Sequence, residues 1–499
     1  MSKKMEIIIR ITDEKGKQIL ESSRERNIPF VEEFDEQGFR KSFDQIEAAV
    51  LETRKEVSEE AISEYMKKVS KKKSGLIGMN DVEITESESK YIVESEIGVI
   101  DITTHKVIDS GNNTVYDVSY DYFDRTQPKE KFRSTSFNEL VLDLAAHTSY
   151  RCNEKIINRI RHEGRATKAC TIRNTVEKEG DALLTHAKKQ AEDALVANGF
   201  SKEGVLINEE AVPKIELEHI DDEIVMEAAR ELNLKEESIK PEEYEHPDQT
   251  INISVDDVSV SRQASKRPDS EEKGKKKKVM NTVIHIQEKD KSYILNAESI
   301  VVTLLLLMGF LASNSLIWTK RIVFFIDGEI NLRKSIVKMF SSLEIKIVLD
   351  WYHVNKKVKE RLSMGMKGYR LRNPFLEKLN PLLWLGKVDA AILLIRGIPP
   401  DQIKSQEHIE KLIEYLERNK PYIPCYSMRA KLGLRNSSNR GEKSNDIVVA
   451  DRQKHNGMSW SKEGSVSLAA ICAAENNGEL MNWVSSRSLS FSFSDPKAA

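Results

Sequence analysis

Apolar residues between positions 321 and 353 follow a strand, helix, strand pattern. Residues 322–326 form a short apolar run that is rich in strand-forming residues and too brief for a helix, so they predict a buried strand. Residues 330–340 carry apolar side chains at helical spacing, and residues 345–349 predict a second buried strand. This order indicates two parallel strands of an open α/β sheet joined by a helix.

Both predicted strands end on an acid. Asp327-Gly328 follows the first strand, Asp350 follows the second, and His353 lies three residues further on. Because the carboxyl ends of parallel strands meet at one edge of such a sheet, the two acids are expected to share a site there. The alternatives are strand-end turns capped by Asp and a histidine satisfied by its neighbours. A zinc site at His353 has no nearby cysteine pair to support it.

The flanking patterns extend this predicted sheet. Residues 251–260 alternate as a strand that Asp256 and Asp257 interrupt, and a carboxylate pair in a strand is unfavourable unless charge is needed there or the strand end is solvated. Further strands are predicted at 279–286 and near 293–295, followed by a core helix at 300–312. Beyond residue 353 the pattern predicts helices at 354–363, 376–383, 388–396 and 408–419.

A separate helical region is predicted at 136–178. Three helices are separated by short turns, the first of them opened by a capping box of Ser136 and Glu139. A helix, a short Gly-containing turn and a second helix have the spacing of a helix-turn-helix, although any small three-helix bundle shares that pattern. Lys168 and Arg173 on the last helix are candidates for contact with DNA phosphates or base edges.

The remaining segments carry no assigned chemistry. A strand is predicted at 7–11, a long charged helix at 43–71 and further strands between 91 and 122. Residues 208–249 are acidic, with one helix expected at 222–232, and are interpreted as a linker or a surface helix.

A block between Cys425 and Lys462 carries eight basic residues against three acids. Excess positive charge suits a surface that binds phosphates in a salt-sensitive manner. A helix beginning near Glu442 places Glu442, Asn445 and Val449 on one side. The candidates for DNA contact in this block are Arg435, Arg440, Lys443, Arg452 and Lys454, with a solvated helix face as the alternative for the last two.

Composition changes this picture little. The 499 residues suggest two to four domains, and a net charge of −3 does not by itself indicate nucleic acid. Four cysteines far apart in the sequence argue against a disulfide framework and suit a reducing cytoplasm. The apolar run near residue 300 is too short to cross a bilayer, so a soluble protein without a membrane partner is expected.

Four stretches in order resemble a known family. SVDDVSV and FFIDGE resemble the strands that carry the first two acids of DDE transposases from bacterial insertion sequences, in the group related to Mutator-like elements. Asp350-Trp-Tyr-His353 matches the D-x-x-H signature of that group, and NRGEKSNDIVVADRQKHNGMSWS resembles its third-acid helix. The match covers roughly residues 250–465. The family pattern has one Asp followed by Gly where this chain has Asp256-Asp257, so the first acid is ambiguous, with Asp256 preferred.

The resemblance implies a metal-dependent DNA recombinase. Asp256, Asp327 and Glu442 would be the catalytic residues and would bind two Mg²⁺ or Mn²⁺ ions, since paired hard cations held by carboxylates serve phosphodiester cleavage and strand transfer. Residues expected to position the ligands or the DNA are Asp257, Asp350, His353 and Asn445. The partners would be double-stranded DNA, as terminal repeats and target, and further copies of the chain in a synaptic complex. The location would be the bacterial cytoplasm, associated with the nucleoid.

The expected fold is α/β, an RNase-H-like mixed sheet with an all-α insertion before the last catalytic helix. The expected regions are 1–130 (α+β, role unassigned), 131–205 (helix-turn-helix-like), 206–249 (acidic linker), 250–353 (first part of the catalytic core), 354–425 (all-α insertion), 426–475 (last part of the core) and 476–499 (a frayed tail). Two other functions fit the same residues: a non-catalytic DNA-binding protein derived from a transposase, and an RNase-H-fold nuclease without strand transfer.

Overall fold

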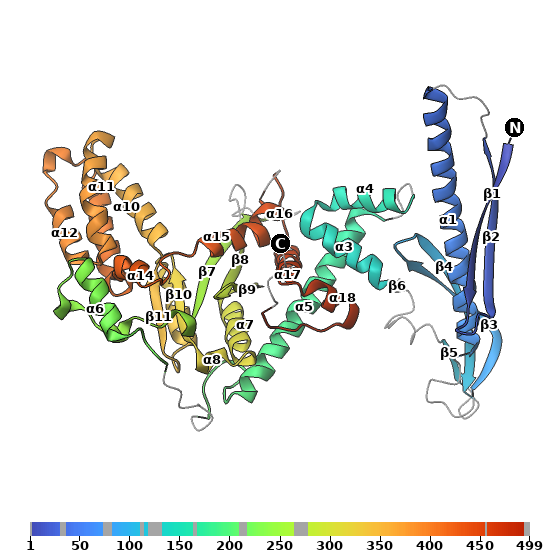
Figure 1. Ribbon diagram of the computed structural model, residues 1–499, viewed down its shortest axis with the longest axis horizontal. Helices are drawn as coiled ribbons and strands as arrows, with labels where there is room; N and C mark the ends of the chain where they lie inside the picture. Colours follow the sequence, from blue (N-terminus) through green and yellow to red (C-terminus); the bar gives the residue numbers. More distant parts are fainter. Residues whose placement is uncertain are drawn as a thin grey trace, which may run out of the picture. The chain divides into compact units, whose positions relative to one another are not determined.

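The computed structural model of the chain describes residues 2–29, 36–72, 82–109, 114–117, 132–162, 167–208, 217–263, 278–454 and 457–493. The chain divides into two compact units, Met1–Thr175 and Val176–Ala499, and combines helices with mixed sheets (Figure 1). Among the described residues, no helix has both the length and the apolar character that a membrane span needs.

The first unit begins with two small sheets and a long helix. Its elements are β1 (Ser2–Thr12), β2 (Gln18–Pro29), α1 (Glu36–Lys72), β3 (Val82–Glu94), β4 (Val99–Asp109), β5 (Thr114–Asp117) and β6 (Phe132–Arg133). β1 and β2 form an antiparallel hairpin, and the second sheet has the order β5-β4-β3-β6. α1 packs against β2 and β4, where Ile62 and Met66 cover a core that includes Tyr91 and Ile102. The predicted helix and strands are therefore present, and positions 118–122 lie outside the described residues.

Three helices follow: α3 (Thr135–His147), α4 (Tyr150–Ile160) and α5 (Ala169–Ala197). Their shared core contains Phe137, Val141, Ile157 and Ile172. The predicted capping box is wrong, because the Ser134 hydroxyl, one residue before the helix, accepts the amide of Phe137 and leaves Ser136 inside the first turn. α5 is much longer than predicted and continues into the second unit, and turn residues 163–166 lie outside the described part of the chain.

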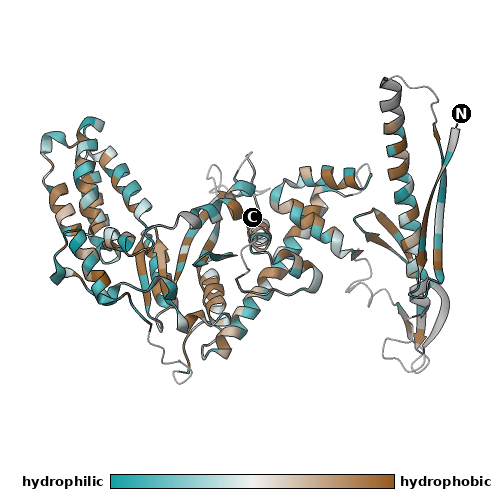
Figure 2. Cartoon of the chain, in the orientation of Figure 1, coloured by the Kyte–Doolittle hydropathy of each residue, from teal (hydrophilic) through white to brown (hydrophobic). Residues whose placement is uncertain are grey.

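The second unit is built on a five-stranded mixed sheet. Its strands are β7 (Thr250–Ser261), β8 (Lys278–Glu288), β9 (Lys291–Ala297), β10 (Arg321–Ile326) and β11 (Ile345–Leu349), in the order β11-β10-β7-β8-β9. β7, β8 and β9 are antiparallel neighbours, whereas β10 runs parallel to both β7 and β11. β10 is buried from Ile322 to Ile326, and β10 and β11 are hydrophobic along most of their length (Figure 2). The strands predicted from short apolar runs are all confirmed.

Helices cover this sheet. They are α7 (Ile300–Ser313), α8 (Leu316–Thr319), α9 (Ile330–Met339) and α17 (Lys462–Asn476), and both α7 and α17 pack against β8 and β9. α5 approaches α7 and α17 closely, since a Cβ on Gly309 would lie 2.3 Å from that of Ala191 and one on Gly180 would lie 2.6 Å from that of Ser467. Glycine at these two positions therefore permits backbone contact between helices.

A helical insertion stands on the β11 side of the sheet (Figure 1). It comprises α10 (Trp351–Gly365), α11 (Tyr369–Trp384), α12 (Val388–Arg396) and α13 (Gln406–Asn419), which pack on one another. The chain then returns to the sheet through α14 (Tyr426–Lys431), α15 (Asn439–Asn445), the π-helical turn η9 (Asp446–Ala450) and α16 (Asp451–Gln453). All four predicted insertion helices are present.

Two segments of polar composition are anchored by apolar side chains. The helix predicted at 222–232 is confirmed as α6 (Asp222–Glu231), and its Val225 and Ala229 join a hydrophobic core with Tyr244 and Met428. The supposed frayed tail contains α18 (Leu480–Ser486), and beyond it Phe491 is 1% exposed and packs edge-on against Phe310. Few apolar side chains, placed at the right spacing, are enough to anchor both segments despite their polar composition.

Candidate functional site

The register of the sheet brings three acids to one level. Ser254 of β7 pairs with Phe325 of β10, so Asp256 and Asp327 each lie two residues beyond that pair in parallel strands. Ile326 pairs with Leu349 of β11, which sets Asp350 beside Asp327. Successive parallel strands therefore deliver carboxylates to one edge of the sheet, as the sequence predicted.

Helix α15 adds a fourth acid from the other side. A Cβ on Gly441 would lie 2.5 Å from the Cβ of Ser254, so only glycine lets this helix approach β7 so closely. The approach sets Asn445 against Asp256, and the Asn445 Nδ2 donates to the carboxylate at 2.6 Å. It also sets Glu442 against His353, whose Nε2 lies 3.4 Å from Oε1 of the glutamate.

These side chains line one small pocket. It is bounded by Ser254, Val255, Asp256, Val283, Phe325, Asp327, His353, Ser438, Gly441, Glu442 and Asn445. All three predicted metal ligands are on this wall, together with two of the residues expected to position them. Asp256 borders the pocket and Asp257 does not; the Asp257 side chain is exposed and accepts the Thr282 hydroxyl at 2.6 Å.

Negative charge accumulates around the pocket. The pKa of Asp256 is raised to about 6: burial is the main cause and the charges of Asp327 and Asp257 add to it, whereas the amide of Asp257 and the His353 ring act in the opposite direction. The pKa of Glu329 is also raised, by partial burial and by Asp327 and Asp257. Like charges that share a site disfavour ionisation, and a bound cation relieves that repulsion. Oxygen ligands of this kind suit Mg²⁺ or Mn²⁺.

Asp350 has a different function from the three pocket acids. It is 1% exposed and caps α10, accepting the Tyr352 amide at 2.7 Å. Its other oxygen accepts both the amide and the hydroxyl of Ser438 at 2.5 Å. Asp350 thus joins the end of β11 to the residue that precedes α15, and so fixes the helix that carries Glu442. Neither Ser438 nor Gly441 was recognised from the sequence, because their importance lies in tertiary contacts.

The basic residues predicted to contact DNA in this region differ in how exposed their side chains are. Lys443 and Lys454 are exposed, while Arg435 is partly buried and donates to Gln287. Arg452 is only 5% exposed and lies over the Trp460 ring at 5.8 Å, which removes it from the exposed basic surface that the sequence predicted. The Arg440 side chain is outside the described part of the chain. Lys168 and Arg173, in the first unit, are both exposed near the start of α5.

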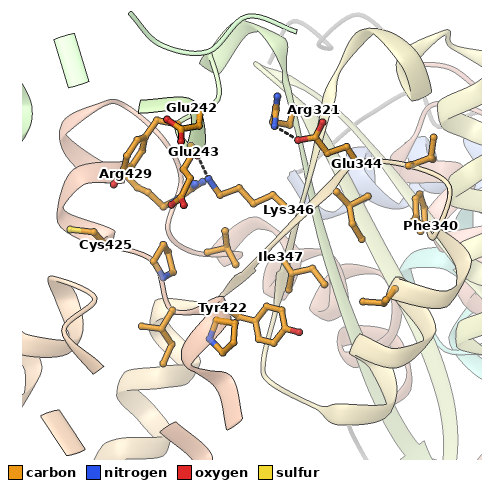
Figure 3. Close-up of a pocket in the computed structure, with 18 of the residues that line it drawn as sticks. Glu242, Glu243, Arg321, Phe340, Glu344, Lys346, Ile347, Tyr422, Cys425 and Arg429 are labelled. Atoms are coloured by element: carbon orange, nitrogen blue, oxygen red, sulfur yellow. Dashed lines mark hydrogen bonds and ion pairs between the residues drawn. The ribbon is translucent and has the colours of Figure 1, made fainter. Parts of the chain in front are cut away.

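A larger cavity of about 900 Å³ lies along the open edge of β11 (Figure 3). Several charged side chains on its wall form ion pairs, either with one another or with a buried acid behind the wall. Arg321 bonds Glu344 at 2.7 Å, and Arg429 bonds the buried Glu245 behind the wall at 2.9 Å. Lys346 also bonds Glu245, at 2.8 Å. This balance of opposite charges distinguishes the cavity from the acidic pocket.

Comparison of the chain with protein-family models, with curated proteins and with solved structures gives no match.

Proposed function

We propose that this protein is a DDE transposase, an enzyme that cuts and joins DNA with divalent metal ions. The observation that carries the proposal is the convergence of Asp256, Asp327 and Glu442 on one pocket from β7, the end of β10 and α15. Two-metal cleavage of a phosphodiester needs a few carboxylates that converge in this way. Segments far apart in the chain have no other evident reason to bring their acids together.

The strand order supports an RNase-H-like fold for this unit. Three antiparallel strands are followed by two that run parallel to the first, and the first strand lies at the centre of the sheet. In that fold the first and fourth strands carry the first two acids, the positions that Asp256 and Asp327 occupy here. The helical insertion lies between the fifth strand and the helix of the third acid, as expected for the family that the sequence resembles.

In this proposal, Asp256, Asp327 and Glu442 hold two Mg²⁺ or Mn²⁺ ions. The ions supply activation of the attacking oxygen and stabilisation of the departing 3′-oxygen. Asn445 orients Asp256 through its hydrogen bond, and His353 orients Glu442. Asp350 holds the start of α15 through Ser438. Outer partners of this kind fix metal ligands in the productive geometry.

DNA would be held by the exposed basic residues. Lys443 lies on α15 and Lys454 directly follows α16, where they could contact phosphates near the scissile bond. In the first unit, α3, α4 and α5 are proposed to bind the terminal repeats, with Lys168 and Arg173 as contacts. Two ends must be held together for transposition, so the active form is expected to contain at least two copies of the chain in the bacterial cytoplasm.

The test is cleavage of labelled duplexes that carry the DNA ends of the element encoding this chain. Native protein with Mg²⁺ should nick at the end, and Asp327→Asn or Glu442→Gln should each lower the rate by more than about 100-fold, the upper range for loss of an outer partner of a metal. Asp446→Asn is the matched control, since this exposed acid lies one helical turn beyond Glu442 and does not border the pocket.

Two other outcomes would change the assignment. Metal-dependent cleavage without joining to a supercoiled target plasmid would favour a nuclease of the same fold. Binding of the ends without any cleavage by native protein would favour a non-catalytic DNA-binding protein. Cleavage that survives both substitutions would contradict the site itself.

A further inference from the structure

Tyr415 of the helical insertion lies close to the loop that carries Asp327. It lies on α13, its side chain is 6% exposed, and its hydroxyl is buried without a hydrogen-bond partner among the described residues. A buried hydroxyl that lacks a partner is unfavourable, and folded proteins rarely retain one without a reason. Packing of the ring alone therefore does not explain why a hydroxyl is present at this position.

The Tyr415 side chain lies next to the Asp327 loop. A Cβ on Gly328 would be 3.4 Å from the Cε2 atom of the tyrosine ring, so the ring lies close to the loop. Burial raises the pKa of Tyr415 well above its ordinary value, and the negative charges of Asp327 and Asp350 raise it further. The hydroxyl is thus held within electrostatic range of both strand-end acids.

The backbone of this part of α13 is fixed by a polar chain. Asn419, which is fully buried, donates from Nδ2 to the Tyr415 carbonyl at 2.9 Å. Its Oδ1 accepts Nη1 of Arg333 on α9 at 3.0 Å, and Arg333 lies over the Tyr422 ring at 4.6 Å. The tyrosine is therefore held between the insertion and the helix that follows Asp327.

Of the two acids, Asp327 has the greater remaining capacity to accept hydrogen bonds. Asp350 already accepts three, from the Tyr352 amide and from the amide and hydroxyl of Ser438, of about four that a carboxylate can accept. In the described part of the chain, Asp327 accepts only the amide of Glu329, on one oxygen at 2.9 Å. Its second oxygen remains the available acceptor on this side of the loop.

We propose that Tyr415 is a positioning residue for the metal ligand Asp327, its hydroxyl donating a hydrogen bond to that carboxylate in the cation-loaded site. The inference rests on the proposed function, because it gives the hydroxyl a partner only where Asp327 binds a cation. It assigns a function to the insertion as well: α13 supplies part of the shell that orients the second strand-end acid. Ligating carboxylates are commonly oriented by hydrogen bonds of this kind.

Tyr426 provides a matched control. It is also fully buried and close to Asp350, but its hydroxyl already donates to the Leu349 carbonyl at 2.7 Å. Removing the hydroxyl from either tyrosine deletes one oxygen and keeps the ring. The two variants should therefore affect different properties. The Tyr426 hydroxyl stabilises the fold, whereas the Tyr415 hydroxyl, in this proposal, orients the metal ligand Asp327.

The experiment measures Mn²⁺ affinity by electron paramagnetic resonance, and thermal unfolding without metal, in the full chain. Tyr415→Phe should lower Mn²⁺ affinity by about 10- to 100-fold, while the Tm without metal stays at or above that of native protein. Tyr426→Phe should keep native affinity and lower the Tm by roughly 2–4 °C. Cleavage by Tyr415→Phe should recover at saturating Mn²⁺, which a structural defect would not allow.

The failures are distinguishable. If native protein binds Mn²⁺ and Asp327→Asn does not, the metal site stands. In that case, native affinity in Tyr415→Phe overturns the inference alone. A lower Tm in Tyr415→Phe with unchanged affinity would also overturn it and assign the residue to the core. If native protein binds no Mn²⁺ above the level of Asp327→Asn, the proposed function and the inference fail together.

Discussion

Two clusters of charged residues in the second unit differ in how their charges are balanced. Beside the β11 cavity, Glu245 and Arg429 are each 1% exposed and pair at 2.9 Å, with Lys346 completing the cluster. Burial alone would raise the pKa of Glu245, but Arg429 and Lys346 hold it below its ordinary value. In the acidic pocket, burial is the main cause that raises the pKa of Asp256 to about 6, and the charges of Asp327 and Asp257 contribute to the rise.

The first cluster contains charges that stabilise the fold, whereas the second contains acids that are proposed to bind a cation. A buried acid next to two cations is satisfied within the chain, so removing it harms the fold. An acid next to other acids is destabilising until a cation arrives, so removing it should help the fold and harm the function. The cavity of about 900 Å³ borders the balanced cluster, whereas the acidic residues line a much smaller pocket.

The largest predicted effect is on the balanced cluster. Glu245→Gln should lower the free energy of unfolding of the second unit by about 3–5 kcal/mol, because Arg429 is left buried without an opposite charge. Urea denaturation followed by tryptophan fluorescence measures this change. Glu344→Gln is the control: its side chain is 80% exposed in its pair with Arg321, and the expected loss is below about 1 kcal/mol. Equal effects would erase the distinction between the two pairs.

The second prediction is a gain in stability in the acidic pocket. The folded-state pKa of Asp256, about 6, lies above the ordinary value of 3.8, so the fold prefers the protonated acid. Native protein should therefore lose stability relative to Asp256→Asn as the pH rises from 4 through 6. Above that range Asp256→Asn should be the more stable without metal, by at most about 3 kcal/mol.

This second comparison uses thermal and urea unfolding at pH 4 and at pH 8, with chelator present. At pH 4 the two proteins should unfold alike. Adding Mg²⁺ at pH 8 should stabilise native protein and leave Asp256→Asn unchanged, since binding to the folded state raises the free energy of unfolding. A constant difference between the proteins across the whole pH range would show that the charge of Asp256 is not the cause.

The smallest predicted effect concerns the link between β11 and α15. Ser438→Ala removes the hydroxyl that donates to Asp350 and should cost about 1–2 kcal/mol. Hydrogen exchange should speed up locally in α15, where the start of the helix is released. Ser405→Ala is the control, because Ser405 precedes α13 in the same manner but its side chain makes no cap hydrogen bond. Unchanged exchange in α15 would mean that Asp350 does not hold that helix.

The sequence predicted the sheet of the second unit well because β10 and β11 are short apolar runs followed by acids, and because apolar residues alternate along the first half of β7. The same logic placed Asp256 and Asp327 at strand positions that become neighbours through parallel pairing. It placed Glu442 on a helix, but nothing local indicated how near that helix comes to β7. That distance depends on Gly441 and Ser254, whose contact joins residues nearly two hundred positions apart in the sequence.

Other predictions failed because the composition of a segment does not specify which way its side chains point. A count of basic residues could not tell that Arg452 turns inward over Trp460 while Lys454 stays exposed. The many acidic residues around α6 outweighed, in the prediction, the few apolar side chains that anchor this helix. In the same way, the serine-rich composition near the C-terminus gave no indication that Phe491 is buried. The Ser136 capping box failed by two residues, since Ser134 offers the same chemistry and has the extended backbone that a cap requires.

The π-helical turn η9 sets the spacing between α15, which carries Glu442, and α16. Glu442 and Asn445 before the turn face the pocket, while Gln453 after it is locked to α17 by hydrogen bonds with Ser465. A π turn holds one more residue than an α turn, so it offsets the two ends by about 100° of rotation. Deleting a single residue between 446 and 450 would yield a more regular helix whose ends are out of phase. Either Glu442 would move away from the pocket or Gln453 would lose its hydrogen bonds with Ser465. The number of residues in this turn therefore matters more than their identity.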